Sequence, residues 1–427
     1  APGITFQGGT FRFRGKNGEA SGSSLGAATF SGGASTIDIV NGTGVGSSAQ
    51  IRFSAATPGA GTVNFTASNG ALGAAGDNPR VFFTNGLTLG AIVPYATVGS
   101  APAYYDATYG IRAYTLAEGT EFDGTSLSQA SVETRYTAAN NHLAVIAAKT
   151  VNSLWIDNPG NGYAVDLATN NLTITSGRIS LTGANDFSLA RSSAGIGTFI
   201  SGTTIYLGVD GAGRTLTIGV PIANGANQVE KDGTGTLALN ATNTFTGALT
   251  INAGTVKYGA FGDLAANAVN IWNGGRLDMA GYTDALGALT IYSGGITNSG
   301  GGGILTNTTL TMGSGPAGSS AYVDMGTGTL KLGGNVAYNV INDPNMAIIA
   351  GNLNLNGATR TFTVNDSMAA AIDMDVPAAI AGAAGFGIVK AGSGTLQLRG
   401  INTFDGPVSV SAGTLRMSHP QSFGVPG

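Results

Sequence analysis

One 25-residue segment occurs twice in this chain of 427 residues, at an offset of 159 positions. The first copy, Lys231 to Thr255, reads KDGTGTLALNATNTFTGALTINAGT, and the second, Lys390 to Thr414, reads KAGSGTLQLRGINTFDGPVSVSAGT. The copies are identical at 13 positions, with no insertion between them. A unit this short cannot bury its own apolar face, so it must stack on neighbours.

The pattern inside the unit predicts short strands separated by corners. Thr236 to Leu239 alternates apolar and polar residues, as a half-buried strand does. Asn243 to Gly247 then turns the chain, with Phe245 as a core anchor, and Leu249 to Ile251 alternates again. We therefore predict an all-β fold, a right-handed parallel β-helix that runs as one continuous β-solenoid over residues 1–427. At roughly 20 residues per rung it has about 20 rungs.

Composition agrees with this class and excludes others. The chain has 70 glycines without a three-residue period, which excludes collagen, and 42% apolar residues, too many for a disordered linker. Only 10% of residues are charged and the net charge is −4, which argues against nucleic acid as a partner. No stretch is apolar enough for membrane insertion of this segment. The absence of cysteine fits an exported, stacked β-structure that needs no disulfides.

The repeated segment resembles a known family. Its pattern K-x-G-x-G-T-L-x-L, then N-T-F-x-G, then A-G-T is similar to the autotransporter-associated β-strand repeat, in copies at about 229–256 and 388–415. That repeat occurs in the passenger regions of large exported proteins of double-membraned bacteria. The resemblance implies a secreted protein of the bacterial cell surface, in a family that includes adhesins. The motif residues are Lys231, Gly233, Gly235, Leu237, Asn243, Phe245, Gly247, Gly254, Lys390, Gly392, Gly394, Leu396, Asn402, Phe404, Gly406 and Gly413.

The two ends of the sequence look complementary. The C-terminal stretch resembles the first half of a repeat, and the N-terminal stretch supplies the strand and turn that follow. Uncapped solenoid ends expose strand edges and tend to associate. We therefore expect the chain to partner itself, as a head-to-tail homo-oligomer or as one unit of a tandem array. The residues predicted at these ends are Ile4, Phe6, Gly8, Gly9, Phe11, Phe423 and Gly424.

The alternation of strands and turns is weaker in residues 94–136. We predict that they form an irregular, Tyr-rich insertion on the solenoid. Aromatic side chains on a polar shaft can bind sugars or a neighbouring subunit, so surface glycans are a second candidate partner. The alternative is that the rings cover an irregular part of the core. The residues of this candidate contact patch are Tyr95, Tyr104, Tyr105, Tyr109 and Tyr114.

No constellation in the sequence points to catalysis, a metal or a cofactor. Asp373 and Asp375 would share one face of a strand, as the carboxylates of a glycosidase can, but no basic partner stands nearby in the sequence. We expect no enzyme activity and no cofactor. The predicted function is a structural subunit of a surface fibre or stalk with an adhesive role. The alternative is a carbohydrate-binding or carbohydrate-cleaving β-helix of tailspike type, which a groove of clustered carboxylates would favour.

Overall fold

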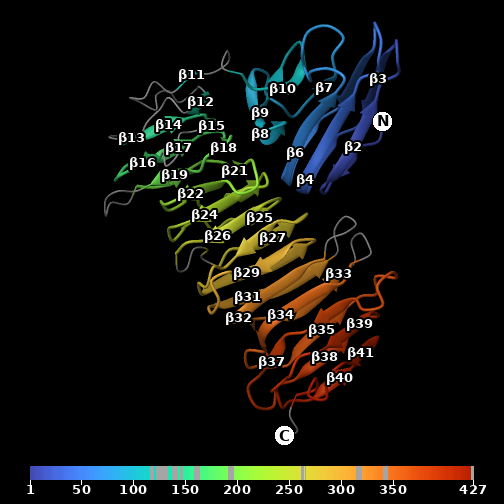
Figure 1. Ribbon diagram of the computed structural model, residues 1–427, viewed down its shortest axis with the longest axis vertical. Coiled ribbons are helices and arrows are strands. Elements are labelled where there is room, and N and C mark those ends of the chain that lie inside the picture. The colour runs from blue at the N-terminus through green and yellow to red at the C-terminus, as the bar shows by residue number, and fades with distance from the viewer. Residues whose placement is uncertain are drawn as a thin grey trace. The chain divides into compact units, whose positions relative to one another are not determined.

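A computed structural model describes residues 1–115, 148–157, 164–190, 197–260, 264, 266–313, 320–339 and 345–424, and the backbone of three further short strands. These residues form strands, turns and bends (Figure 1). Among them no helix is long and apolar enough to cross a membrane. The strands stack in parallel as a β-solenoid of about 13 turns. The chain divides into two compact units, Ala1–Val220 with Val229–Thr236, and Pro221–Gln228 with Leu237–Gly427.

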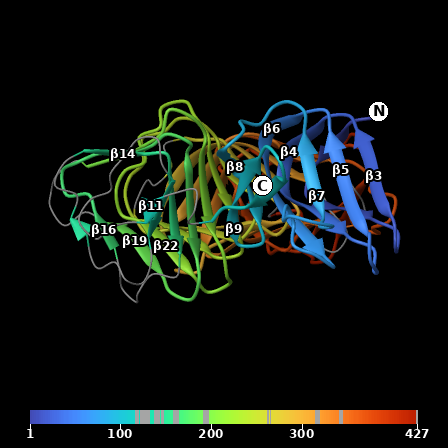
Figure 2. The same cartoon turned by 90° about the horizontal axis from the view of Figure 1, so that it is seen from above.

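Unit 1 begins with two sheets whose early strands alternate along the chain. Figure 2 shows β3, β5 and β7 side by side in the smaller sheet. The strands of the smaller sheet are β3 (Ala20–Leu25), β5 (Ser48–Phe53) and β7 (Arg80–Phe83). Those of the larger sheet are β1 (Ile4–Phe6), β2 (Gly9–Arg14), β4 (Ala28–Val40), β6 (Ala56–Ser68), β8 (Ala91–Val98), β9 (Ala101–Asp106) and β10 (Gly110–Ala113).

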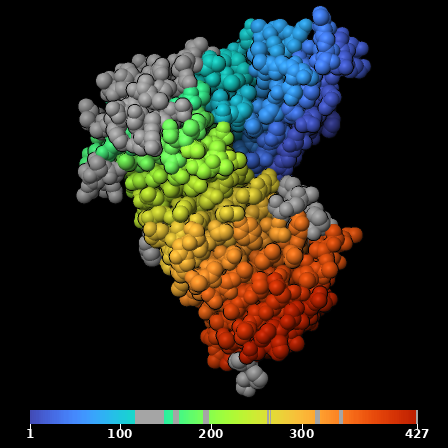
Figure 3. Space-filling view, in the orientation of Figure 1, coloured from blue at the N-terminus to red at the C-terminus, as the bar shows by residue number. Residues whose placement is uncertain are grey.

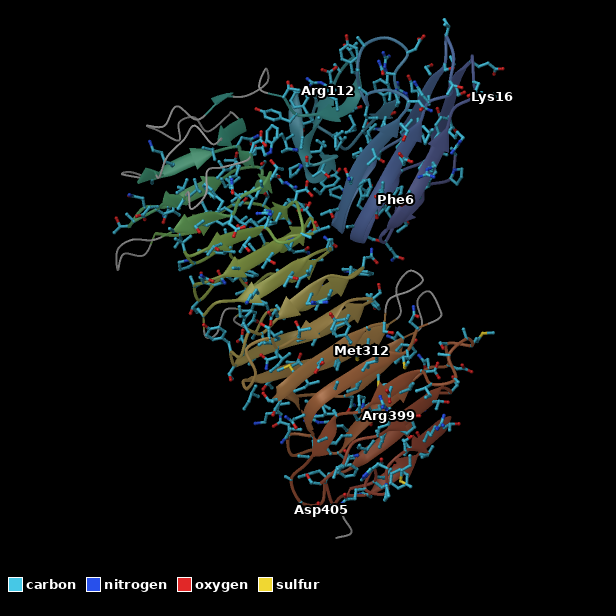
Figure 4. The ribbon with its side chains drawn as sticks, viewed as in Figure 1. Phe6, Lys16, Arg112, Met312, Arg399 and Asp405 are labelled. Atoms are coloured by element: carbon cyan, nitrogen blue, oxygen red, sulfur yellow. The ribbon has the colours of Figure 1, made fainter. Side chains whose placement is uncertain are left out.

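Stacked phenylalanines fill the core between these two sheets. Phe6, labelled in Figure 4, stacks on Phe30 with ring centroids 5.2 Å apart, and Phe53 stacks on Phe83 at the same separation. All four rings are buried. Because one residue of each pair stands in the rung after the other, the rings form ladders along the stack, which add to the stabilisation from burial alone.

The strand direction reverses at the end of the larger sheet. β4, β6 and β8 run parallel to one another, whereas β9 pairs antiparallel with both β8 and β10. This antiparallel segment contains most of the described part of the Tyr-rich stretch. Within this stretch β8, β9 and β10 are regular strands, and β9 departs from the parallel direction of the solenoid; residues 116–119 and 122–132 lie outside the described residues.

Unit 1 continues with a parallel solenoid that has three strand stacks. The stack β14–β17–β20 forms its own small sheet. Its strands are β14 (Lys149–Val151), β17 (Leu172–Ile174) and β20 (Phe199–Ile200). The other two stacks contain β11 (Thr120–Glu121), β12 (Glu133–Tyr136), β13 (Leu143–Ala144), β15 (Ser153–Asp157), β16 (Ala164–Asp166), β18 (Arg178–Thr182), β19 (Phe187–Ala190), β21 (Ile205–Val209), β22 (Thr215–Ile218) and β23 (Val229–Asp232).

Unit 2 is built from strands that pair in parallel (Figure 1). Its strands are β24 (Thr236–Leu239), β25 (Leu249–Ile251), β26 (Thr255–Tyr258), β27 (Val269–Trp272), β28 (Arg276–Asp278), β29 (Asp284–Tyr292), β30 (Gly295–Thr297), β31 (Ile304–Gly313), β32 (Tyr322–Leu332), β33 (Val336–Asn339), β34 (Ala347–Asn354), β35 (Arg360–Val364), β36 (Met374–Val376), β37 (Ala379–Ala381), β38 (Ile388–Ala391), β39 (Thr395–Leu398), β40 (Val408–Val410) and β41 (Thr414–Met417).

The core of unit 2 is organised as columns of inward-facing residues, one from each rung. One column, from β27 to β35, consists of Val269, Leu289, Leu310, Val336 and Phe362, and every member is buried. Parallel pairing in register places equivalent apolar residues directly above one another, so each rung buries the one before it.

The prediction of an all-β parallel solenoid is confirmed, and the number of turns is lower than the expected 20 or so. The advance per rung explains the difference. It is 20 residues from Val269 to Leu289, close to the expected length, but 28 residues from Phe362 to Lys390. Longer rungs, together with the antiparallel strands β9 and β10 that add no parallel rung, lower the number of turns to about 13.

Candidate functional site

The repeated motif has a well-defined local geometry that recurs in both copies. In each copy a strand ends one residue after the motif lysine and a tight turn leads to the next strand, from β38 to β39 in the second copy. Gly392 in this turn has φ +80°, and an added Cβ would lie only 2.5 Å from the Val364 carbonyl oxygen. Gly233, its counterpart in the first copy, has φ +71°, and an added Cβ there would come similarly close to the Val209 carbonyl oxygen. The turn therefore requires glycine for both its backbone conformation and its contact with the preceding rung.

The other motif glycines have the same two roles. Four of them approach a neighbouring rung so closely that a Cβ would clash, namely Gly235, Gly247, Gly394 and Gly406. Gly254 and Gly413 adopt φ of 68° and 69°, which disfavours any residue with a side chain. The motif leucines Leu237 and Leu396 are buried in the core, as the alternation predicted.

The motif lysines are fully buried and occupy core columns. Lys231 follows Leu207 in register, and Lys390 follows Phe362. Both have 0% exposure. Their ammonium groups turn out of the column and donate to backbone carbonyls at the adjacent turn. Burial lowers the pKa of Lys231 to about 7, although the neighbouring Asp232 carboxylate opposes the shift, and burial also lowers the pKa of Lys390.

The corner of the motif ties successive rungs together. Asn402 is buried; its Oδ1 accepts from the Ile380 N–H at 2.8 Å, and its Nδ2 donates to the Ser422 carbonyl at 2.6 Å. In the first copy the Asn243 Oδ1 accepts from the Ile222 N–H at 2.9 Å. One side chain, that of Asn402, thus satisfies backbone groups of the rungs before and after its own.

Replacing Asn402 with alanine is expected to lower the free energy of unfolding of unit 2 by about 1–3 kcal/mol, because it leaves a buried N–H and a buried carbonyl without partners. Urea titration followed by circular dichroism measures the loss. The matched control is the exposed Asn339, whose replacement by alanine should change stability by less than about 0.5 kcal/mol. Equal effects of the two substitutions would contradict the role assigned to Asn402.

The predicted acidic pair serves structure in this fold. Asp373 accepts backbone N–H groups of Ser367 at 2.8 Å and Thr395 at 2.7 Å. Asp375 pairs with Arg399, labelled in Figure 4, with Nε 2.8 Å from Oδ1. Both carboxylates are therefore engaged by neighbouring groups. Among the described residues, no cluster of three or more histidine or acidic side chains is placed to hold a metal.

The tyrosines of the candidate contact patch lie in two environments. Tyr95, Tyr105 and Tyr114 are buried in the core, while Tyr104 and Tyr109 are partly exposed. Arginine side chains cover the last two rings, with Arg112 lying 4.5 Å from the Tyr104 centroid. The five rings do not form one exposed aromatic surface, because three of them point into unit 1.

The buried tyrosines join the antiparallel segment to the solenoid of unit 1. Tyr95 contacts Tyr206 of β21 with ring centroids 6.3 Å apart, and Tyr114 contacts Trp155 of β15 at 6.0 Å. Arg178 Nη1 also donates to the Pro94 carbonyl at 3.3 Å. The segment thus covers the outward face of several consecutive rungs.

A buried ion pair that the sequence does not predict lies beneath the antiparallel segment. Arg178 of β18 and Asp232 of β23 are two rungs apart, yet Nη1 and Oδ2 are 2.7 Å from each other. Gly208 of β21, the register partner of Asp232 and of Ser180, lies between the two side chains, and a Cβ there would lie 2.8 Å from Asp232 Oδ1 and would collide with the guanidinium. The missing side chain lets the arginine pass across the middle rung. No local sequence signal marks this arrangement, because its members are 54 residues apart.

The predicted end residues lie at the first and last described rungs. Ile4 and Phe11 are half-buried against the N-terminal core, Phe6 is buried within it, and Gly8 and Gly9 have positive φ at the turn between β1 and β2. At the other end Phe423 is 43% exposed and Gly424 has φ +81°.

Comparison with known proteins agrees with the motif geometry. The family model described as passenger-associated-transport-repeat matches residues 229–257 and 388–417. A segment of 178 residues, 40% of the chain, is 30% identical to a protein named adhesin BmaC autotransporter from Brucella suis biovar 1 (strain 1330). This segment spans only 5% of that relative's length. No solved structure matched the chain.

Proposed function

We propose that this chain, two segments of which match the passenger-associated-transport-repeat model, is a stiff, non-catalytic segment of a secreted cell-surface adhesin whose solenoid ends stack head to tail. Its rungs are held by backbone pairing between successive strands and by a core of buried apolar side chains. Both features favour a stack that resists deformation and proteases.

The observation that carries the stacking proposal is an open core at the last rung of unit 2. Val410 continues the column that contains Phe362 and Lys390, and Met417 continues the column that contains Leu398. Their partners are fully buried, but Val410 is 51% and Met417 46% exposed. β40 and β41 each pair on one side among the described strands. This C-terminal face, Val408–Val410 with Thr414–Met417, belongs to the red part of the chain in Figure 3.

The first rung of unit 1 has a similar open side. β1 and β2 pair with β4, and β3 with β5, so each has one neighbour among the described strands. Phe11 is half-buried while its register partner Ile37 is fully buried. A parallel strand added at either end would pair the free backbone groups and bury these columns. The fitting partner is another solenoid end of the same kind, from a separate copy or from a tandem unit of a longer chain.

Aspartate at both Val410 and Met417 is expected to abolish end-to-end association, because a carboxylate in a core column opposes burial. Sedimentation velocity over a range of concentrations and electron microscopy of frozen samples measure the association. The matched control is Met368→Asp, which adds the same charge at an apolar residue that is 92% exposed and is not part of this face. We expect the control to associate like the wild-type protein. A wild-type chain that stays monomeric at high concentration would overturn the stacking proposal.

A denaturing gel of native filaments distinguishes stacking of separate copies from stacking of tandem units within one longer chain. A band near the chain mass of 42.3 kDa means that separate copies stack, and a much larger band means that the segment is one unit of a long chain.

The absence of catalysis is the second part of the proposal. It is supported by the engagement of Asp373 by two backbone N–H groups and of Asp375 by Arg399. Incubation with bacterial and host polysaccharides should release no new reducing ends. Release that disappears in Asp375→Asn would establish the carbohydrate-cleaving alternative instead.

A further inference from the structure

The two motif lysines make the same unusual set of contacts. Lys231 Nζ lies 2.6 Å from the Asp232 carbonyl and 2.7 Å from the Gly233 carbonyl. Lys390 Nζ lies 2.8 Å from both the Ala391 and the Gly392 carbonyls. In each copy, therefore, the side chain folds back on the carbonyls of the next two residues. The two lysines, 159 positions apart and in different units, repeat this geometry.

The second copy shows that the next rung contributes to the same site. Lys390 Nζ also lies 3.1 Å from the carbonyl of Ala412, 22 residues further along the chain. Gly413 follows, and a Cβ there would lie 2.8 Å from Nζ. Three carbonyl oxygens thus surround the nitrogen, and a glycine keeps the space beside it open. Three acceptors match the three N–H donors of an ammonium group.

We infer that the motif turn and the following Ala-Gly turn form a backbone cation site, occupied by the chain's own lysine, that accepts a primary alkylammonium when that side chain is shortened. The carbonyls of Ala391, Gly392 and Ala412 define the site in the second copy. The site goes beyond the proposed adhesin role and is independent of it.

The chemistry of the site explains why a lysine stands in a core column. The aliphatic stem of Lys390 continues the column after Phe362, while its head leaves the column to reach polar groups. The ammonium donates to carbonyls of the motif turn and of the following Ala-Gly turn, so its three N–H groups all have acceptors. Charge-assisted hydrogen bonds to these carbonyls offset part of the desolvation of the ammonium. The planar guanidinium of arginine, with five donors, does not match three convergent carbonyls.

The test is chemical rescue of Lys390→Ala. Propylammonium has the carbons and the nitrogen that this substitution removes. We expect Lys390→Ala to lower the Tm of unit 2 by at least about 5 °C. Saturating propylammonium should return a clear part of that loss, because a ligand that binds only the folded state raises Tm. It should not raise the Tm of the wild-type protein.

Two controls separate the cation site from a general effect of the amine. Lys390→Met fills the column without donors and should be destabilised but not rescued by propylammonium. 1-Propanol, which has the same chain and one donor, should rescue Lys390→Ala far less. Equal responses of Lys390→Ala and Lys390→Met, or a Lys390→Met protein as stable as the wild type, would overturn the inference.

A measurement on the wild-type protein keeps the inference testable if Lys390→Ala does not fold. Amine acetylation under native conditions, followed by peptide mass spectrometry, should modify the exposed Lys16 and leave Lys231 and Lys390 unmodified. Prior unfolding in urea should make all three reactive. Rapid acetylation of Lys390 in the folded protein would show that its ammonium is not held in the site.

Discussion

Replacing Arg178 with methionine is expected to destabilise unit 1 by about 3–5 kcal/mol. The substitution keeps most of the side-chain volume but removes the ion-pair partner of Asp232. The Asp232 side chain is buried, so its carboxylate would lose this partner in the interior of the unit. It also removes hydrogen bonds to Ser180 and to the Pro94 carbonyl. A buried charge without a partner costs far more than the pair itself contributes, so the loss should be large.

Urea unfolding and hydrogen exchange of β18, β23 and the segment around Pro94 measure the effect. Because Arg178 connects two rungs to the antiparallel segment, exchange should rise in all three places. The double variant Arg178→Met, Asp232→Leu should recover much of the loss, since it replaces the pair by apolar groups.

A matched control is the exposed pair of Lys16 and Glu19 in the same unit, whose side chains are 77% and 62% exposed. Lys16→Met should change stability by less than about 1 kcal/mol. If Arg178→Met behaves like Lys16→Met, the ion pair has no structural role. Additive losses in the double variant would show that the two residues do not act as a pair.

The repeat itself could be predicted from sequence because its signals are local. Alternation over Thr236 to Leu239 and the glycine turns specify strands and corners within a few residues, and the structure has the strand where the pattern placed it. Phe245 and Phe404 are fully buried at the corners, as predicted. Short-range pattern is enough here because each rung contacts only its neighbours.

The role of the motif lysines could not be predicted in the same way. From the sequence, a lysine before a glycine turn is expected to be exposed. Only the register of β38 between β35 and β40 places Lys390 in a core column. The environment of the tyrosines has a similar cause. Whether Tyr95 faces solvent or a partner depends on Tyr206, which lies 111 positions away along the chain. Corner lengths also vary from rung to rung, and the repeated unit alone does not reveal them.

Replacing Phe404 with alanine is expected to lower the stability of unit 2 by about 3–5 kcal/mol, because it removes a fully buried ring and leaves a cavity at the corner. The corner has little room to collapse. Gly382 and Gly424 approach Phe404 so closely that a Cβ on either would lie within 3.4 Å of atoms of that residue. Such tight backbone packing resists the relaxation that would otherwise reduce the loss of stability.

The control is Phe386→Ala in the same unit, since Phe386 is 36% exposed and its removal should cost clearly less. Urea titration compares the two, and hydrogen exchange locates the damage. In a stack of rungs that contact only their neighbours, a defect in the last corner should expose β38 to β41 while β27 to β30 stay protected. Uniform loss of protection across unit 2 would mean that it unfolds as one cooperative block, and the rung-by-rung account of its stability would then be wrong.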